Sequence, residues 1–123
     1  MRKIFILEDM EIRIRCFKKV LSDYNLTIVK TAKEAIEILS KNLDFDILFL
    51  DHDLGDRIFV NTKDENTGST VATFLSDKEV KGKIIIHSYN PVGAKYMLGL
   101  LPKAIYIPFS ESLLRNISKG LKQ

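Results

Sequence analysis

The sequence predicts an α/β fold in which helices cover both faces of a doubly wound, five-stranded parallel sheet. Short runs rich in Ile, Val, Leu and Phe alternate with longer amphipathic segments along the whole chain. The apolar runs are continuous, as expected for strands that are buried on both faces. The chain has 123 residues and no internal repeat or Pro/Gly-rich linker, so we expect a single domain over residues 1–123.

The predicted strands are the runs of four to six residues with the highest content of apolar residues. We expect strands at residues 3–7, 26–30, 45–50, 83–87 and 104–107.

The first two helices have the clearest signals. A capping box, Thr31 followed by Glu34, predicts the start of the second helix, and apolar residues at positions 35, 36 and 39 form its inward face. The first helix is predicted by apolar residues at spacings of four, three and four, which share one stripe: Met10, Ile14, Phe17 and Leu21.

Three further helices are expected, starting near Thr67, after Pro91 and after Ser110. Gly93 and Gly99 weaken the second of these, because glycine has a low helix propensity. Residues 54–66 form an unusually long connection with mixed charges, and a small hairpin or binding lid and a plain surface excursion are both open interpretations.

Composition indicates an ordinary globular protein. The net charge of +3 arises from 19 basic and 16 acidic residues that are scattered along the chain. A scattered excess is compatible with a polyanionic partner such as RNA, but we expect no sequence-specific DNA binding. No apolar run is long enough to span a membrane, and Cys16 has no second cysteine with which to form a disulfide, so we expect a cytoplasmic protein.

Polar residues follow the strands directly. The carboxyl ends of parallel strands meet at one edge of a sheet, which is where ligands bind in this fold class. Three or more carboxylates should converge there, although acids at such positions also serve as caps for helix N-termini. The residues at this edge are Glu8, Asp9, Asp51, His52, Asp53, His87 and Ser88.

Converging carboxylates need a counter-charge, because two like charges about 4 Å apart repel by about 4 kcal/mol at an effective dielectric near 20. Protons with raised pKa values or a divalent cation could supply it. We favour Mg²⁺ or Mn²⁺, since hard carboxylate oxygens suit these ions. The candidate metal ligands are Glu8, Asp9, Asp51 and Asp53.

Over essentially its whole length the chain resembles the receiver domains of response regulators. The resemblance implies flavodoxin-like topology with strand order 2-1-3-4-5, an acidic pair at Glu8 and Asp9, a phosphoacceptor-like Asp51, and Ser88 as the hydroxyl that contacts the phosphoryl group. The chain departs from ordinary receivers at Ile107, which stands before Pro108 where they have a lysine. Arg57 and Lys95 are the candidates to replace that charge.

Two longer motifs resemble those of a subgroup, the cyclic-phosphate processing receiver domains. They are Asp-His-Asp-Leu-Gly at 51–55 and His-Ser-x-Asn-Pro-x-Gly-Ala at 87–94. The resemblance implies processing of cyclic or terminal phosphates on RNA or nucleotides, as in RNA repair. A Mg²⁺- or Mn²⁺-dependent phosphodiesterase or phosphatase that acts on a phosphorylated small molecule or an RNA end would fit it.

For that chemistry the candidate catalytic residues are Asp51, His52, His87 and Ser88, and the candidate phosphate-binding residues are Ser88, Asn90, Arg57 and Lys95. Either histidine could move protons near neutral pH. Each also has a purely structural interpretation, as does Asn90, which could simply form a turn before the helix at Pro91.

Several alternatives stay open. Asp51 could be a nucleophile, a metal ligand only, or a phosphoacceptor in a signalling receiver. The chain could also be a degenerate receiver that acts as an interaction module for a protein partner. Tyr89, Tyr96 and Phe59 could stack on bases, although packing against the protein is the favoured interpretation.

Overall fold

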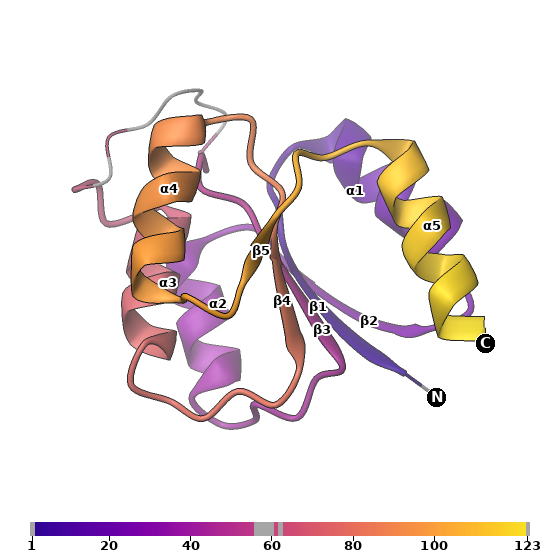
Figure 1. Cartoon of the computed structure of the whole chain (residues 1–123), viewed down its shortest axis with the longest axis horizontal. Helices are drawn as coiled ribbons and strands as arrows, with labels where there is room; N and C mark the ends of the chain where they lie inside the picture. Colours follow the sequence, from indigo (N-terminus) through magenta and orange to yellow (C-terminus); the bar gives the residue numbers. More distant parts are fainter. Residues whose placement is uncertain (1, 56–60, 62, 123) are drawn as a thin grey trace.

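Strands and helices alternate along the chain in the computed structural model, which describes residues 2–55, 61 and 63–122 (Figure 1). The elements are β1 (Lys3–Leu7), α1 (Glu11–Val20), β2 (Asn25–Val29), α2 (Ala32–Leu39), β3 (Ile47–Leu50), α3 (Gly68–Leu75), β4 (Lys83–Ile86), α4 (Pro91–Leu100), β5 (Ile105–Tyr106) and α5 (Glu111–Lys122).

The five strands form one parallel sheet in the order β2-β1-β3-β4-β5, which confirms the predicted fold and strand order. Helices α1 and α5 cover one face, and α2, α3 and α4 cover the other (Figure 1). Because the chain runs outward from β1 in both directions, the loops after β1, β3 and β4 meet at one edge of the sheet.

Alternation along the strands builds two cores. Ile4 and Ile6 pack under α1 and α5, whereas Phe5 and Leu7 pack under α2 to α4. All four side chains are fully buried, as the continuous apolar run predicts. This alternation also decides which face each polar residue reaches beyond the strand ends.

Several predicted boundaries are wrong by one or two residues. β3 begins at Ile47 rather than at residue 45, because the Phe45 N–H donates to Leu43 O in a turn. β5 contains only Ile105 and Tyr106, β2 begins and ends one residue earlier than predicted, and β4 ends one residue earlier. Met10 precedes α1 and is 40% exposed, so it does not share the buried stripe.

The helix starts agree with the predicted signals. The Thr31 hydroxyl accepts the Glu34 N–H at 3.1 Å at the start of α2, as the capping box predicts. Thr67 precedes α3, and the Asn90 side chain caps α4 by accepting the Gly93 N–H at 3.0 Å.

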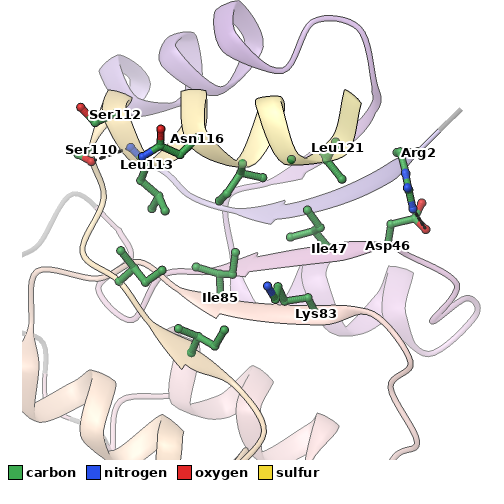
Figure 2. Close-up of a pocket in the computed structure, with 14 residues that line it drawn as sticks. Arg2, Asp46, Ile47, Lys83, Ile85, Ser110, Ser112, Leu113, Asn116 and Leu121 are labelled. Carbon is green, nitrogen blue, oxygen red and sulfur yellow. Dashed lines mark hydrogen bonds and ion pairs between the residues drawn. The ribbon is translucent and has the colours of Figure 1, made fainter. Parts of the chain in front are cut away.

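A groove of about 840 Å³ lies between α5 and the β4–β5 side of the sheet (Figure 2). Its lining is largely aliphatic, and Ile107 contributes to it. The groove contains none of the residues predicted for the acidic site. No helix in the described part of the chain is both long and apolar enough to cross a membrane.

The predicted lid at residues 54–66 lies partly outside the described residues, since 56–60 and 62 are not described. Arg57 and Phe59 belong to that segment. The ends of the connection are fixed: Asp53 and Thr67 form an antiparallel bridge, and the Gly68 N–H donates to His52 O at 2.9 Å.

Candidate active site

Glu8 lies directly after β1 and is completely buried. One carboxylate oxygen, Oε2, accepts the backbone N–H groups of Asp9 and Met10, each at 3.1 Å. The other, Oε1, lies 3.0 Å from His87 Nε2 and 3.4 Å from an Arg13 guanidinium nitrogen. Glu8 is therefore held by hydrogen bonds on both oxygens, which is what a buried carboxylate requires.

Asp51 follows β3, the strand next to β1, and is 3% exposed. Its Oδ1 accepts the His52 N–H at 2.8 Å, and its Oδ2 lies 3.7 Å from the Arg13 guanidinium. Gly68 makes this position possible, because a Cβ there would stand 2.0 Å from the Asp51 carbonyl oxygen. The start of α3 thus packs directly against the backbone of the acidic residue.

Arg13 is the cation that connects the two carboxylates. It lies on α1, is 8% exposed, and contacts both Glu8 and Asp51. Its guanidinium carbon also stands 4.4 Å from the centre of the Tyr89 ring and 5.3 Å from that of Phe109. An arginine held in this way places a positive charge beside both acids, in a planar form suited to carboxylate or phosphate.

His87 is fully buried below Glu8, and the rings of Phe17, Phe49 and Phe109 surround it. Since a carboxylate only accepts, His87 Nε2 donates to Glu8. In the described part of the chain, His87 Nδ1 has no hydrogen-bond partner. His87 therefore orients Glu8 from the face of the sheet that α1 and α5 cover.

The electrostatic balance differs between the two acids. Burial raises the pKa of Asp51 to about 7, and the negative charge of Glu8 adds to this effect, whereas His87 and Arg13 oppose it. Burial also acts to raise the pKa of Glu8, but the His87 hydrogen bond and charge, the Met10 N–H and Arg13 together hold it below its ordinary value. Glu8 is thus the more acidic member of the pair.

The donor set fits a divalent cation. Among the described residues, ligand atoms of Glu8, Asp51 and His87 lie within 4.8 Å of one another. The two carboxylates suit Mg²⁺ or Mn²⁺. His87 fits less well as a ligand, because ligation through Nε2 would leave a buried Nδ1–H without an acceptor among the described residues, whereas metal-bound histidines normally donate that proton. We therefore regard Glu8 and Asp51 as the metal-binding pair, with His87 supporting them.

The structure places Asp9 and Asp53 outside this group of ligand atoms. Asp9 is half-buried next to Glu8. Asp53 instead joins a second network, in which its Oδ1 accepts from Asn90 Nδ2 at 3.0 Å and lies 2.8 Å from His52 Nδ1. Asn90 therefore connects the loop after β3 to the start of α4.

His52 is fully buried and lies on the opposite face of the sheet from His87. Its ring packs on α4 so closely that a Cβ at Gly93 would stand 2.4 Å from His52 Cγ. His52 Nε2 has no partner in the part of the chain that the structure describes. The His52 ring thus joins the loop after β3 to the start of α4, and only the backbone N–H of His52 contacts the carboxylate pair.

The remaining predicted site residues occupy different environments. Ser88 is 1% exposed, and its Oγ accepts the Asn90 N–H at 3.0 Å. Lys95 is exposed on α4, and none of its described contacts reaches the acidic pair. Arg57 lies outside the described residues.

Arg13 is the residue that the sequence interpretation missed, because it was counted among the scattered basic residues. A signal was present. Arg13 lies four residues before Phe17 and next to Ile14, so it falls beside the stripe that faces the sheet. A charged residue on an apolar helix face requires a buried partner of opposite charge.

Comparison with known proteins gives one family. The model of a family described as "Cyclic-phosphate processing Receiver domain" matches residues 3–103. No curated protein matches the sequence significantly.

Solved structures show the same fold. A receiver domain from Methylobacillus flagellatus is 18% identical with a TM-score of 0.69, and covers 98% of each chain. The response regulator TrrA of Thermotoga maritima, solved with Mg²⁺ and BeF, is 18% identical with a TM-score of 0.73, over 99% of this chain and 97% of the other. The Mn²⁺-bound form of the response regulator Rcp1 is 16% identical with a TM-score of 0.69, over 99% and 92%.

Proposed function

Because the chain belongs to the family of cyclic-phosphate processing receiver domains, we propose that it is a Mg²⁺- or Mn²⁺-dependent enzyme that acts on phosphate esters. The proposed substrates are cyclic or terminal phosphates of RNA or nucleotides. The observation that carries the proposal is the buried group formed by Glu8, Asp51 and Arg13 at the ends of neighbouring strands. Two acids and one arginine offer a cation site beside an anion site.

The residues divide the chemistry between them. Glu8 and Asp51 hold the cation, which when bound polarises the phosphate and activates water. With the carboxylates occupied by a cation, Arg13 would be free to bind another anion. We assign it to the phosphoryl oxygens, because its planar donors match the geometry of phosphate. The Ser88 hydroxyl is a second donor to the phosphate, and His87 keeps Glu8 in the orientation needed for ligation.

Turnover of defined RNA ends tests the proposal. The protein is incubated with Mg²⁺ or Mn²⁺ and oligonucleotides that end in a 2′,3′-cyclic, a 3′- or a 5′-phosphate, and the products are separated by chromatography. Asp51→Asn should abolish turnover, and His87→Ala should lower it about 10- to 100-fold, as removal of groups that orient metal ligands does. Asp46→Asn is the matched control, because Asp46 lies beside β3 at the opposite edge of the same sheet. Turnover that survives Asp51→Asn refutes the assignment.

A second candidate is a signalling receiver that is phosphorylated on Asp51. The placement of Asp51 at the end of β3 favours it, as does the likeness of the fold to response regulators. Ile107 opposes it, because its N–H donates to Ile86 O and the residue lines the groove under α5, so no cation comes from β5. A stable mass increase after treatment with a small phosphodonor, lost in Asp51→Asn, would favour this function over catalysis.

A third candidate is an interaction module without site chemistry. A metal at about 100 times its dissociation constant stabilises a protein by about 2.7 kcal/mol. A melting temperature that stays constant through titrations of both metals would support the interaction module and remove the basis of the enzymatic proposal.

A further inference from the structure

Tyr89 is an exposed aromatic residue that is nevertheless fixed in place. It directly follows Ser88, and 56% of it is exposed. Its hydroxyl donates to Phe109 O at 2.6 Å, which holds the edge of the ring against the loop after β5. The expectation that Tyr89 packs against the protein therefore describes only one side of the ring.

Arg13 occupies that inner side. Its guanidinium carbon lies 4.4 Å from the centre of the Tyr89 ring, and the same guanidinium contacts Glu8 and Asp51. The ring thus stands one guanidinium group away from the carboxylate pair. Since the inner face is taken and the hydroxyl is bonded, the exposed fraction corresponds mainly to the outer face.

Other apolar side chains are exposed on the same edge of the sheet. Ile12, in the first turn of α1, is 72% exposed, and Val92, in the first turn of α4, is 73% exposed. Met10, between β1 and α1, is 40% exposed. Exposed apolar groups at the edge of the sheet that also holds the carboxylates suit a ligand that carries a flat, weakly polar part as well as an anionic part, rather than inorganic phosphate alone.

We infer that the outer face of Tyr89 stacks on the nucleobase of a ligand whose phosphate lies at Glu8, Asp51 and Arg13. This inference rests on the proposed function and narrows its substrate class to phosphate esters that carry a nucleobase. A single stacking face accepts every base, so the substrate class is defined by the phosphate and not by the sequence. A ring that is already held loses little conformational freedom when the base binds.

Two ligands that differ only in the base test the inference. Adenosine 2′,3′-cyclic phosphate and the base-free 1-O-methylribose 2,3-cyclic phosphate are titrated into the full chain with Mn²⁺ by calorimetry, and hydrolysis is followed in parallel. The wild type should bind the adenosine compound about 5- to 100-fold more tightly. Tyr89→Ala should weaken binding of the adenosine compound far more than binding of the base-free ligand, whereas Tyr89→Phe keeps the stacking face and should retain the difference between the two ligands. Tyr96→Ala is the control, since Tyr96 is a tyrosine of similar exposure, 49%, further along α4.

The outcomes separate stacking from catalysis. Equal affinity of the wild type for both ligands overturns the stacking role, and so does an equal loss for both in Tyr89→Ala, which would mean that Tyr89 acts by holding Arg13. Base-dependent binding without hydrolysis of either compound keeps the stacking role and refutes the proposed reaction. Equal hydrolysis of both compounds by the wild type and by Tyr89→Ala keeps the proposed reaction and refutes the stacking role. Absence of binding by either compound refutes both.

Discussion

Removing the charge of Asp51 should stabilise the metal-free protein, and the gain should depend on pH. In the folded protein the pKa of Asp51 is raised from 3.8 to about 7, chiefly by burial and also by Glu8. Between these values the folded protein holds a proton that the unfolded chain has lost. Stability is therefore greatest below the unfolded value and falls as the pH rises towards 7.

The size of the effect follows from the shift. About 3 pKa units correspond to about 4 kcal/mol, at about 1.4 kcal/mol per unit. This is a large fraction of the roughly 5–15 kcal/mol that stabilises a typical domain. Asparagine keeps an oxygen that can accept the His52 N–H, now 2.8 Å from Asp51 Oδ1, so Asp51→Asn removes the charge with little change in hydrogen bonding.

Urea unfolding in EDTA at a series of pH values from 4 to 8 measures the effect. Asp51→Asn and the wild type should be similar near pH 4, and the variant should be more stable by up to about 4 kcal/mol at pH 8. Mn²⁺ should stabilise the wild type at pH 8 but not the variant. A variant that is less stable than the wild type at pH 8, or a difference that does not change with pH, would show that Asp51 is not strained by burial.

Three further predictions concern residues around the site. Gly93→Ala should destabilise the protein by about 1–3 kcal/mol in thermal unfolding, because the new methyl group meets His52. Gly99→Ala on the same helix has nothing within 4 Å of its Cβ and should stabilise the protein by about 0.4–1 kcal/mol. Equal effects would contradict the close packing. Arg13→Met should lower stability at pH 8 in EDTA, because a buried positive charge beside the carboxylates is lost. For the same reason the variant should bind Mn²⁺ roughly tenfold more tightly in calorimetry. Weaker Mn²⁺ binding would instead mean that Arg13 helps to build the site. Thr31→Ala should cost about 1 kcal/mol in urea unfolding at pH 7, because the Thr31 hydroxyl accepts the Glu34 N–H and caps α2, and an unchanged stability would contradict this role.

The fold was predictable because its local signals agree with one another. Continuous apolar runs gave the strands, and the capping box at Thr31 gave the start of α2. The strand order came from the resemblance to receivers and is confirmed by the sheet. Strand ends were less predictable, since the turn at Phe45 and the two-residue length of β5 depend on hydrogen bonds that no residue type specifies.

The site was only partly predictable, because proximity at one edge of a sheet does not tell which face a side chain reaches. His52 has the same parity as Leu48 and Leu50, which face α2 to α4, whereas His87 has the parity of Ile85, which faces α1 and α5. Because side chains alternate between the two faces along a strand, this parity predicts that His52 and His87 lie on opposite faces of the sheet. The role of Arg13 required knowing that α1 lies against this edge.

The bridge between Asp53 and Thr67 fixes both ends of the connection that follows β3. With both ends fixed, doubling the number of residues between them would cost only about 0.6 kcal/mol of loop-closure entropy. A longer connection at this point would therefore change the stability of the domain little, while the backbone that carries Asp51 and Asp53 stays in place.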